Sequence, residues 1–122
     1  MAKLIDLRTF TDARGNLTVV EKVLPFDIKR VFYIYGVDDS IRGGHRHHKT
    51  IEAADCIQGS CKIYYNNNVS EDVFEINNPS KCLILERLDW QTMYDFTKDG
   101  ILMVFASKYF DSADYIFEPY NK

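Results

Sequence analysis

The sequence has few of the residues that build most transition-metal sites. It has three histidines among 122 residues, all between positions 45 and 48. Its three cysteines, Cys56, Cys61 and Cys82, make an odd number without the paired spacing of a zinc site. A disulfide framework or a zinc knuckle is therefore not expected. We expect all three to be buried thiols, because free cysteine packs as a small apolar residue.

The sequence also lacks long apolar runs, low-complexity stretches and internal repeats. Its longest apolar run, residues 101–106, is far too short to span a bilayer. Charges interrupt residues 1–8 too often for a signal peptide. The net charge of −3 argues against a general nucleic-acid binder, which would carry a basic stripe. These absences predict a cytoplasmic protein with neither a membrane nor a nucleic-acid partner.

What the sequence does contain is a period of two in hydrophobicity. Short segments rich in β-branched or aromatic residues alternate with turn signals such as Gln58-Gly59-Ser60. The expected strands are residues 31–35, 61–65, 73–76, 82–85 and 101–105. Many short strands at this spacing predict an all-β antiparallel sandwich or barrel, formed by one domain over residues 1–122. The tail from Asp111 to Lys122 is expected to form one helical turn before Pro119.

The chemistry is expected at the histidines. On a strand, successive side chains point to opposite faces, so His45 and His47 share one face while Arg46 and His48 share the other. Paired imidazoles titrate near neutrality, which suits proton transfer or the binding of a divalent metal ion. With Glu52 they offer the two-histidine, one-carboxylate set that holds non-haem iron in unrelated enzymes. The remaining interpretation of the histidine cluster is a polar surface strand without a chemical role.

The spacing His45-x-His47, Glu52, Gly59 resembles the second half of the first cupin signature. This resemblance implies a small jelly-roll barrel with the histidines and the glutamate at its mouth. No histidine follows position 48, so a three-histidine metal site cannot be formed from this chain.

Over nearly its whole length the chain resembles a narrower group, the sugar-nucleotide 3,4-ketoisomerases of the WxcM-like cupins. The matching blocks are Asp12-x-Arg14-Gly15-x-Leu17, Pro25-Phe26-x-Ile28-Lys29-Arg30-Val31-x-Tyr33-Ile34, Arg42-Gly43-x-His45-x-His47, Cys56-Ile57-x-Gly59-Ser60-Cys61, Asp95-Phe96, Met103-Val104-x-Ala106-Ser107-x-Tyr109-x-Asp111 and Asp114-Tyr115-Ile116. The resemblance implies a metal-independent isomerase without a cofactor that acts on dTDP-4-keto-6-deoxyglucose.

Four features depart from the pattern of that group. Arg46 stands where a small residue is usual, and Gln91 replaces the histidine that normally follows Trp90. The pair Glu86-Arg87 replaces Gly-Pro, and Asp55 lies in an expected apolar strand. These departures concern the pocket and the sugar stereochemistry rather than the fold.

Moving a ketone from C4 to C3 of a hexose needs two proton-transfer groups beside those carbons. His45 or His47 is expected to act as the base and the other histidine as a proton shuttle. By resemblance, Tyr33 is a pocket tyrosine that donates to the enediolate oxygen.

The diphosphate of the ligand favours guanidinium groups, which hold two oxygens at once. The expected substrate-binding residues are Arg14, Arg30, Arg42, Trp90 and Gln91.

Two other functions remain open at this stage. One is a related 3,5- or 4-epimerase on the same barrel, and the other is a non-catalytic cupin that binds a sugar nucleotide. A homodimer is expected in each case, with residues 1–7 involved, because a small barrel must protect its apolar edge strands.

Overall fold

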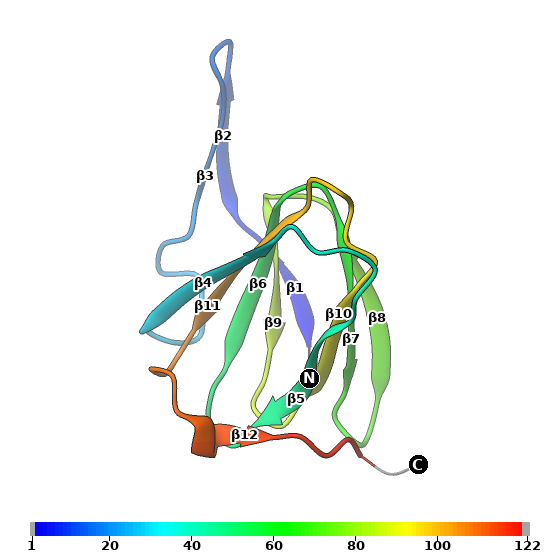
Figure 1. The fold of residues 1–122 in the computed structure, drawn as a ribbon. Coiled ribbons are helices and arrows are strands. Elements are labelled where there is room, and N and C mark those ends of the chain that lie inside the picture. Colours follow the sequence, from blue (N-terminus) through cyan, green and yellow to red (C-terminus); the bar gives the residue numbers. More distant parts are fainter. Residues whose placement is uncertain (1, 121–122) are drawn as a thin grey trace.

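A computed structural model describes residues 2–120, which fold into two antiparallel five-stranded sheets and one separate hairpin (Figure 1). The first half of the chain forms β1 (Lys3–Asp6), β2 (Arg8–Asp12), β3 (Gly15–Val19), β4 (Arg30–Tyr35), β5 (Arg42–His47) and β6 (Glu52–Gln58). The second half forms β7 (Cys61–Asn66), β8 (Glu71–Ile76), β9 (Lys81–Leu85), β10 (Trp90–Tyr94), β11 (Ile101–Ala106), the 3-10 turn η1 (Ser112–Asp114) and β12 (Tyr115–Ile116).

The strands are ordered β1-β9-β6-β11-β4 in one sheet and β12-β5-β10-β7-β8 in the other. Apart from the consecutive pair β7 and β8, neighbours in each sheet are not consecutive in sequence, as expected of the small jelly-roll barrel implied by the cupin resemblance. The all-β prediction is confirmed, and all five expected strands lie within or match β4, β7, β8, β9 and β11. The strands missed by the sequence pattern include β6, whose two faces are both covered, so polarity does not alternate along it.

The space between the two sheets has an apolar and a polar part. Leu83, Leu102, Val104, Ile63 and Met93 fill the apolar part and are at most 3% exposed. The polar part lies at the beginning of β6 and the end of β5, where charged and imidazole side chains point inward. Cys56 and Cys61 lie in the same interior, and the three cysteines are free and buried, as expected.

The outer face of the first sheet has a second, smaller core. Ala53, Cys82, Ile84 and Phe105 point outward from β6, β9 and β11, and the loop over residues 20–28 covers them with Val20, Leu24 and Phe26. Asp55 is buried on this same face with one carboxylate oxygen unpartnered. Burial raises the pKa of its carboxyl group from 3.8 to about 7.

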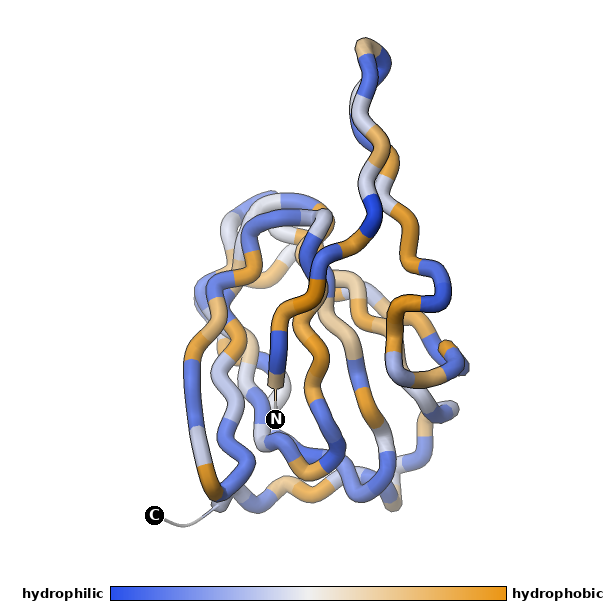
Figure 2. The backbone as a smooth tube through the Cα atoms, turned by 180° about the vertical axis from the view of Figure 1, so that it is seen from behind, coloured by the Kyte–Doolittle hydropathy of each residue, from blue (hydrophilic) through white to orange (hydrophobic). Residues whose placement is uncertain are grey.

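The β2–β3 hairpin stands clear of the barrel, and polar and apolar residues alternate along it (Figures 1 and 2). Its apolar side chains Phe10 and Leu17 face each other across the hairpin and are 51% and 60% exposed. β1, by contrast, pairs with β9 of its own chain.

The C-terminal segment closes the lower end of the barrel in Figure 1. Asp111 caps η1 by accepting a hydrogen bond from the Ala113 amide, so the expected helical turn is confirmed as a 3-10 turn. β12 then pairs with β5. None of the helical turns in residues 2–120 has the length and apolar character needed to cross a membrane.

Candidate active site

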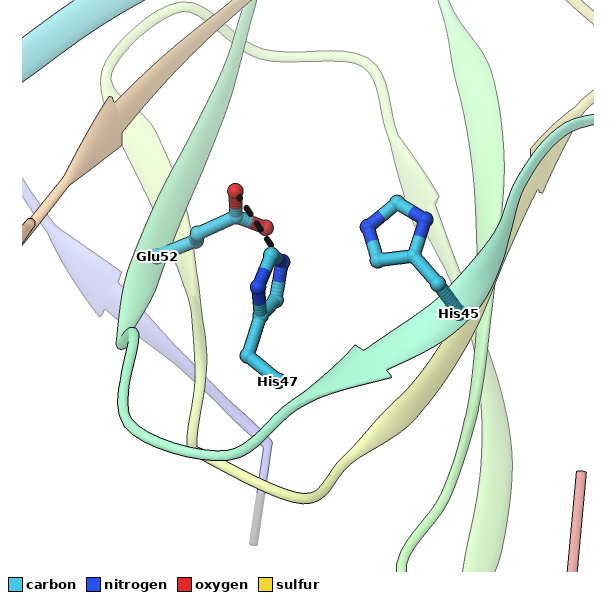
Figure 3. Close-up of side chains that lie close together, drawn as sticks. All are labelled: His45, His47 and Glu52. Atoms are coloured by element: carbon cyan, nitrogen blue, oxygen red, sulfur yellow. Dashed lines mark ion pairs between the residues drawn. The ribbon is translucent and has the colours of Figure 1, made fainter. Parts of the chain in front are cut away.

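His45 and His47 project from β5 into the barrel, as strand alternation predicts (Figure 3). Their ring centroids are 4.8 Å apart and the rings meet edge to face. Gly43 makes this placement possible, because it has a φ of +82° and a Cβ there would lie 2.9 Å from the Gln91 carbonyl oxygen. β5 therefore approaches β10 closely at an irregularity that sets His45 opposite Gln91.

Glu52 brings a buried carboxylate to the same pocket from the first residue of β6. One oxygen accepts a hydrogen bond of 3.0 Å from the Gln91 side-chain amide. The other lies 3.6 Å from His47 Nε2 and 4.0 Å from an Arg30 guanidinium nitrogen. Arg30 also lies over the rings of Phe32 and Phe110. The structure thus brings Arg30 and Gln91, two of the expected binding residues, to the histidines.

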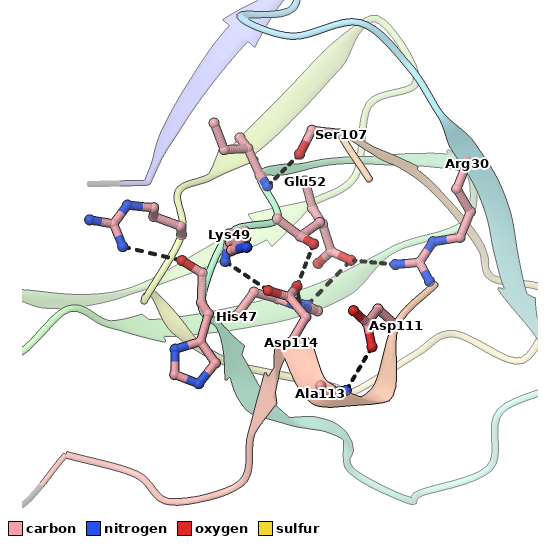
Figure 4. Close-up of polar contacts among 12 residues, drawn as sticks. Arg30, His47, Lys49, Glu52, Ser107, Asp111, Ala113 and Asp114 are labelled. Atoms are coloured by element: carbon pink, nitrogen blue, oxygen red, sulfur yellow. Dashed lines mark hydrogen bonds and ion pairs between the residues drawn. The ribbon is translucent and has the colours of Figure 1, made fainter. Parts of the chain in front are cut away.

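Asp114 holds the other side of the His47 ring (Figure 4). Its Oδ2 accepts hydrogen bonds from His47 Nδ1, at 3.0 Å, and from the Thr50 hydroxyl. Its Oδ1 accepts a hydrogen bond of 2.8 Å from the Lys49 amide. Burial opposes ionisation of this carboxyl, but these hydrogen bonds outweigh it and lower the pKa of Asp114. Nδ1 is therefore the protonated nitrogen of His47, and Nε2 faces the pocket without a hydrogen-bond partner among the described residues.

His45 is held in its neutral form. Burial, followed by repulsion from His47, lowers the pKa of His45 from 6.5 to about 4, and Arg30 adds to the effect. The ring packs against Tyr115 at 4.8 Å and lies near Phe117 at 6.4 Å, both from the C-terminal segment. The pocket thus combines a neutral imidazole with a second imidazole that lies between two carboxylates. Such a pair can accept and return protons within one small space.

The same side chains have the donor set for a divalent ion. One ligand atom from each of His45, His47 and Glu52 lies within 4.8 Å of the other two. Gln91 pairs with His45 across β5 and β10, and its amide is already engaged with Glu52.

The remaining expected site residues lie elsewhere in this chain. Tyr33 is 59% exposed and stacks on Tyr35, because the period of β4 puts it on the opposite face from Arg30. Trp90 is half-buried and alternates with the inward-facing Gln91 along β10. Arg42 is exposed at the beginning of β5.

Arg14 is the most distant of these residues from the histidines. It is exposed at the turn of the β2–β3 hairpin and forms a 2.6 Å ion pair with Asp12. The hairpin and the β5–β12 end lie at opposite ends of the molecule (Figure 1).

Sequence reasoning missed the function of Asp114, Thr50 and Tyr115. Asp114 and Tyr115 lie in a block that matches the resembling family, but nothing local in that block links them to His47. The contact between Asp114 and His47 joins positions 67 residues apart. Only the pairing of β12 with β5 brings them together.

The jelly-roll barrel and its inward-facing histidine pair define the class: a cupin with two imidazoles and a carboxylate in its interior. A family profile described as FdtA: WxcM-like, C-terminal matches residues 1–121, so the chain belongs to this family.

One relative matches most of the chain. It is 36% identical over 118 residues to the TDP-4-oxo-6-deoxy-α-D-glucose-3,4-oxoisomerase of Aneurinibacillus thermoaerophilus, covering 93% of this chain and 84% of the relative.

Two solved structures are similar to this chain in both fold and sequence. A mutant of the 3,4-ketoisomerase QdtA from Thermoanaerobacterium thermosaccharolyticum, in complex with TDP-4-keto-6-deoxyglucose, is 42% identical with a TM-score of 0.92, covering 96% of this chain and 87% of that one. The TDP-fucose-3,4-ketoisomerase WlaRA from Campylobacter jejuni is 34% identical with a TM-score of 0.89, covering 96% and 89%.

Proposed function

We propose that this protein is a metal-independent 3,4-ketoisomerase that acts on a TDP-linked 4-keto-6-deoxyhexose. Family membership and the relatives of 34% to 42% identity support the reaction class. The observation that carries the proposal is the His45–His47 pair, in which Asp114 holds Nδ1 of His47 and leaves Nε2 to exchange protons with a substrate. TDP-4-keto-6-deoxyglucose is the substrate to test first.

The reaction needs two proton transfers at carbon and no redox partner. The C3–H bond breaks and its electrons form the C3=C4 bond of an enediol, while the C4 oxygen takes a proton. A proton then adds to C4, the C3 oxygen loses its proton, and the ketone stands at C3. We assign the base to His47, because its Nε2 has no hydrogen-bond partner among the described residues and lies 3.6 Å from the Glu52 carboxylate. Neutral His45 relays protons between the two oxygens.

The neighbouring side chains bind and orient the sugar nucleotide. Arg30 lies at the edge of the polar pocket and supplies a guanidinium for the diphosphate, with Arg42 as a second candidate. The Gln91 amide holds Glu52 in place, and its carbonyl oxygen, which has no partner among the described residues, is available to a sugar hydroxyl. Tyr33 and Trp90 face away from this pocket and are not assigned a role on their own chain.

We also propose that the protein works as a homodimer in the cytoplasm. An isolated two-stranded hairpin is marginal in water, and the β2–β3 hairpin exposes Phe10 and Leu17. The outer face of β4, β6 and β11 offers an apolar groove lined by Tyr33, Tyr35, Ile57, Ile101 and Met103. Docking of each hairpin on a second copy would cover both surfaces and carry Arg14 toward the partner. Free buried thiols agree with a reducing compartment.

The reaction is tested by incubating the protein with TDP-4-keto-6-deoxyglucose in heavy water and following it by proton NMR. A ketoisomerase forms a 3-keto sugar with deuterium mainly at C4. Deuterium at C5 would instead identify an epimerase, and an unchanged substrate would identify a non-catalytic binding protein. Either result would overturn the proposal.

Metal independence is tested separately by chelation. We expect the turnover of a sample dialysed against EDTA to equal that of the untreated enzyme. Activity that disappears with the metal and returns with stoichiometric iron or manganese would contradict this part of the proposal and implicate the cluster of His45, His47 and Glu52.

A further inference from the structure

Arg46 lies between the two histidines of the site but points away from them. Strand alternation along β5 puts His45 and His47 inside the barrel and Arg46 on its outer side. Its Nε donates a hydrogen bond of 3.1 Å to the Glu118 carbonyl oxygen. Its guanidinium carbon lies 4.0 Å from the centre of the Tyr120 ring. Arg46 therefore points away from a substrate bound at the histidines and instead contacts Glu118 and Tyr120.

These two residues belong to the segment that completes the histidine site. Residues 111–120, here called the C-terminal strap, carry Asp114, which holds His47 Nδ1 at 3.0 Å. The strap also carries Tyr115, whose ring centre is 4.8 Å from that of His45 and 4.6 Å from that of His47. A displaced strap would remove both contacts at once.

Ahead of β12, the strap is also held through Asp114, which accepts hydrogen bonds from the Lys49 amide and the Thr50 hydroxyl. β12 contains two residues, so its pairing with β5 is too short to hold the strap by itself. The backbone adds a bond from the His48 amide to the Asp114 carbonyl oxygen. Beyond β12, the contacts with the barrel are the Phe117 ring near His45, the Tyr120 hydroxyl, which donates to the Leu88 carbonyl oxygen at 2.7 Å, and Arg46. Arg46 is the one that also stacks on the Tyr120 ring and so orients that hydroxyl.

We propose that Arg46 is a positioning residue of the isomerase site: by clamping Glu118 and Tyr120 it keeps the strap docked and Asp114 on His47. The inference rests on the proposed function for its kinetic consequence and on the structure alone for its conformational one. It also gives a physical role to Arg46, which stands where the ketoisomerase pattern usually has a small residue.

The test compares Arg46→Ala with Arg87→Ala. Arg87 is a matched control, because it is an exposed arginine that donates to a backbone carbonyl, that of His48, and makes no hydrogen bond or ring contact with the strap within residues 2–120. Backbone amides of residues 113–118 are followed by hydrogen–deuterium exchange without substrate, and the His47 nitrogens by ¹⁵N NMR. In Arg46→Ala we expect faster exchange confined to the strap and loss of the single Nδ1-protonated signal. Arg87→Ala should match the wild type in both.

Kinetics complete the test. Arg46→Ala should lower kcat by about 10-fold with a smaller change in KM, because misplacement of a catalytic group by a fraction of an ångström slows the reaction more than binding. Arg46→Lys, which keeps the charge but loses the flat stacking group, should fall between Arg46→Ala and the wild type. Strap exchange at the wild-type rate in Arg46→Ala would overturn the proposal, as would faster exchange with unchanged kcat. If the wild type has no isomerase activity, exchange and NMR still decide whether Arg46 docks the strap.

Discussion

At the scale of single residues, the pocket is a set of proton carriers whose states are fixed by their neighbours. Burial keeps His45 neutral, and Asp114 binds Nδ1 of His47, so that Nε2 is the nitrogen left without a hydrogen-bond partner among the described residues. Arg46 lies on the other face of β5, and the exposed His48 follows the last residue of this strand. The imidazoles that face the interior therefore occupy alternate positions of β5.

The histidines provide the first prediction at this scale. His47→Asn and His45→Asn should each lower turnover by at least about 10²-fold, because each removes a positioned proton-transfer group. His48→Asn is the matched control on the exposed side of the strand and should leave turnover unchanged. Steady-state kinetics on TDP-4-keto-6-deoxyglucose measure all three. An active His47→Asn enzyme would contradict the mechanism.

Asp114 provides the second prediction. Its two oxygens accept three hydrogen bonds, from the Lys49 amide, Thr50 and His47, whereas an asparagine has one acceptor oxygen. Asp114→Asn should therefore lower kcat by about 10²-fold with little change in KM, since the His47 tautomer is no longer fixed.

Asp111→Asn is the control for Asp114→Asn. Asp111 lies beside the same 3-10 turn but only caps its backbone, a role that asparagine also fills. Equal losses of kcat in the two variants would show that Asp114 acts by stabilising the 3-10 turn rather than by orienting His47.

At the scale of elements, β6 contributes side chains both to the interior core between the sheets and to the smaller outer core. Glu52, Ala54 and Cys56 face the interior, while Ala53 and Asp55 face the outer core under the loop over residues 20–28. Small side chains suit a strand that is covered on both faces. Asp55 is the exception, since its carboxyl is 3% exposed and incompletely partnered.

Asp55 predicts a pH dependence of stability. Its pKa is about 7 in the folded protein against the ordinary 3.8, so between these values the folded state keeps a proton that the unfolded chain loses. Stability from this group is full below pH 3.8 and falls as the pH rises toward 7. Asp55→Asn carries no charge, so it should raise Tm at pH 8 by about 8 °C, equivalent to about 2 kcal/mol, and much less at pH 4.5.

Thermal denaturation at the two pH values checks this prediction. Asp39→Asn, an exposed aspartate in the loop after β4, is the control and should change Tm little at either pH. An Asp55→Asn gain that is the same at pH 4.5 and pH 8 would show that ionisation of Asp55 is not the cause.

At the scale of the whole molecule, the projecting hairpin and the apolar outer groove are two surfaces that one chain leaves open. We expect light scattering at micromolar concentration to give the mass of a dimer. Phe10→Ser combined with Leu17→Ser should shift the protein toward monomers, because these are the exposed apolar residues of the hairpin. Val69→Ser, at a 93% exposed residue between β7 and β8, is the control for lost surface hydrophobicity. A wild-type protein of monomer mass would reject the dimer.

The sequence by itself determined what depends on local geometry. The period of two predicted the strands and placed His45 and His47 on one face, because side chains alternate along any extended chain. The buried thiols and the capped turn at Asp111 also followed from residue type and spacing. The resemblance to the ketoisomerases agreed with the family that the whole chain matches.

Only the tertiary structure decided which faces meet. Asp114 reaches His47 because β12 pairs with β5, and Gln91 reaches Glu52 because β10 lies in the facing sheet. The same alternation that predicted the shared face of the histidines turns Tyr33 away from them, since Tyr33 lies on the opposite face of β4 from the inward-facing Arg30. Strand order and register are set by packing between segments far apart in sequence, and no local pattern contains that information.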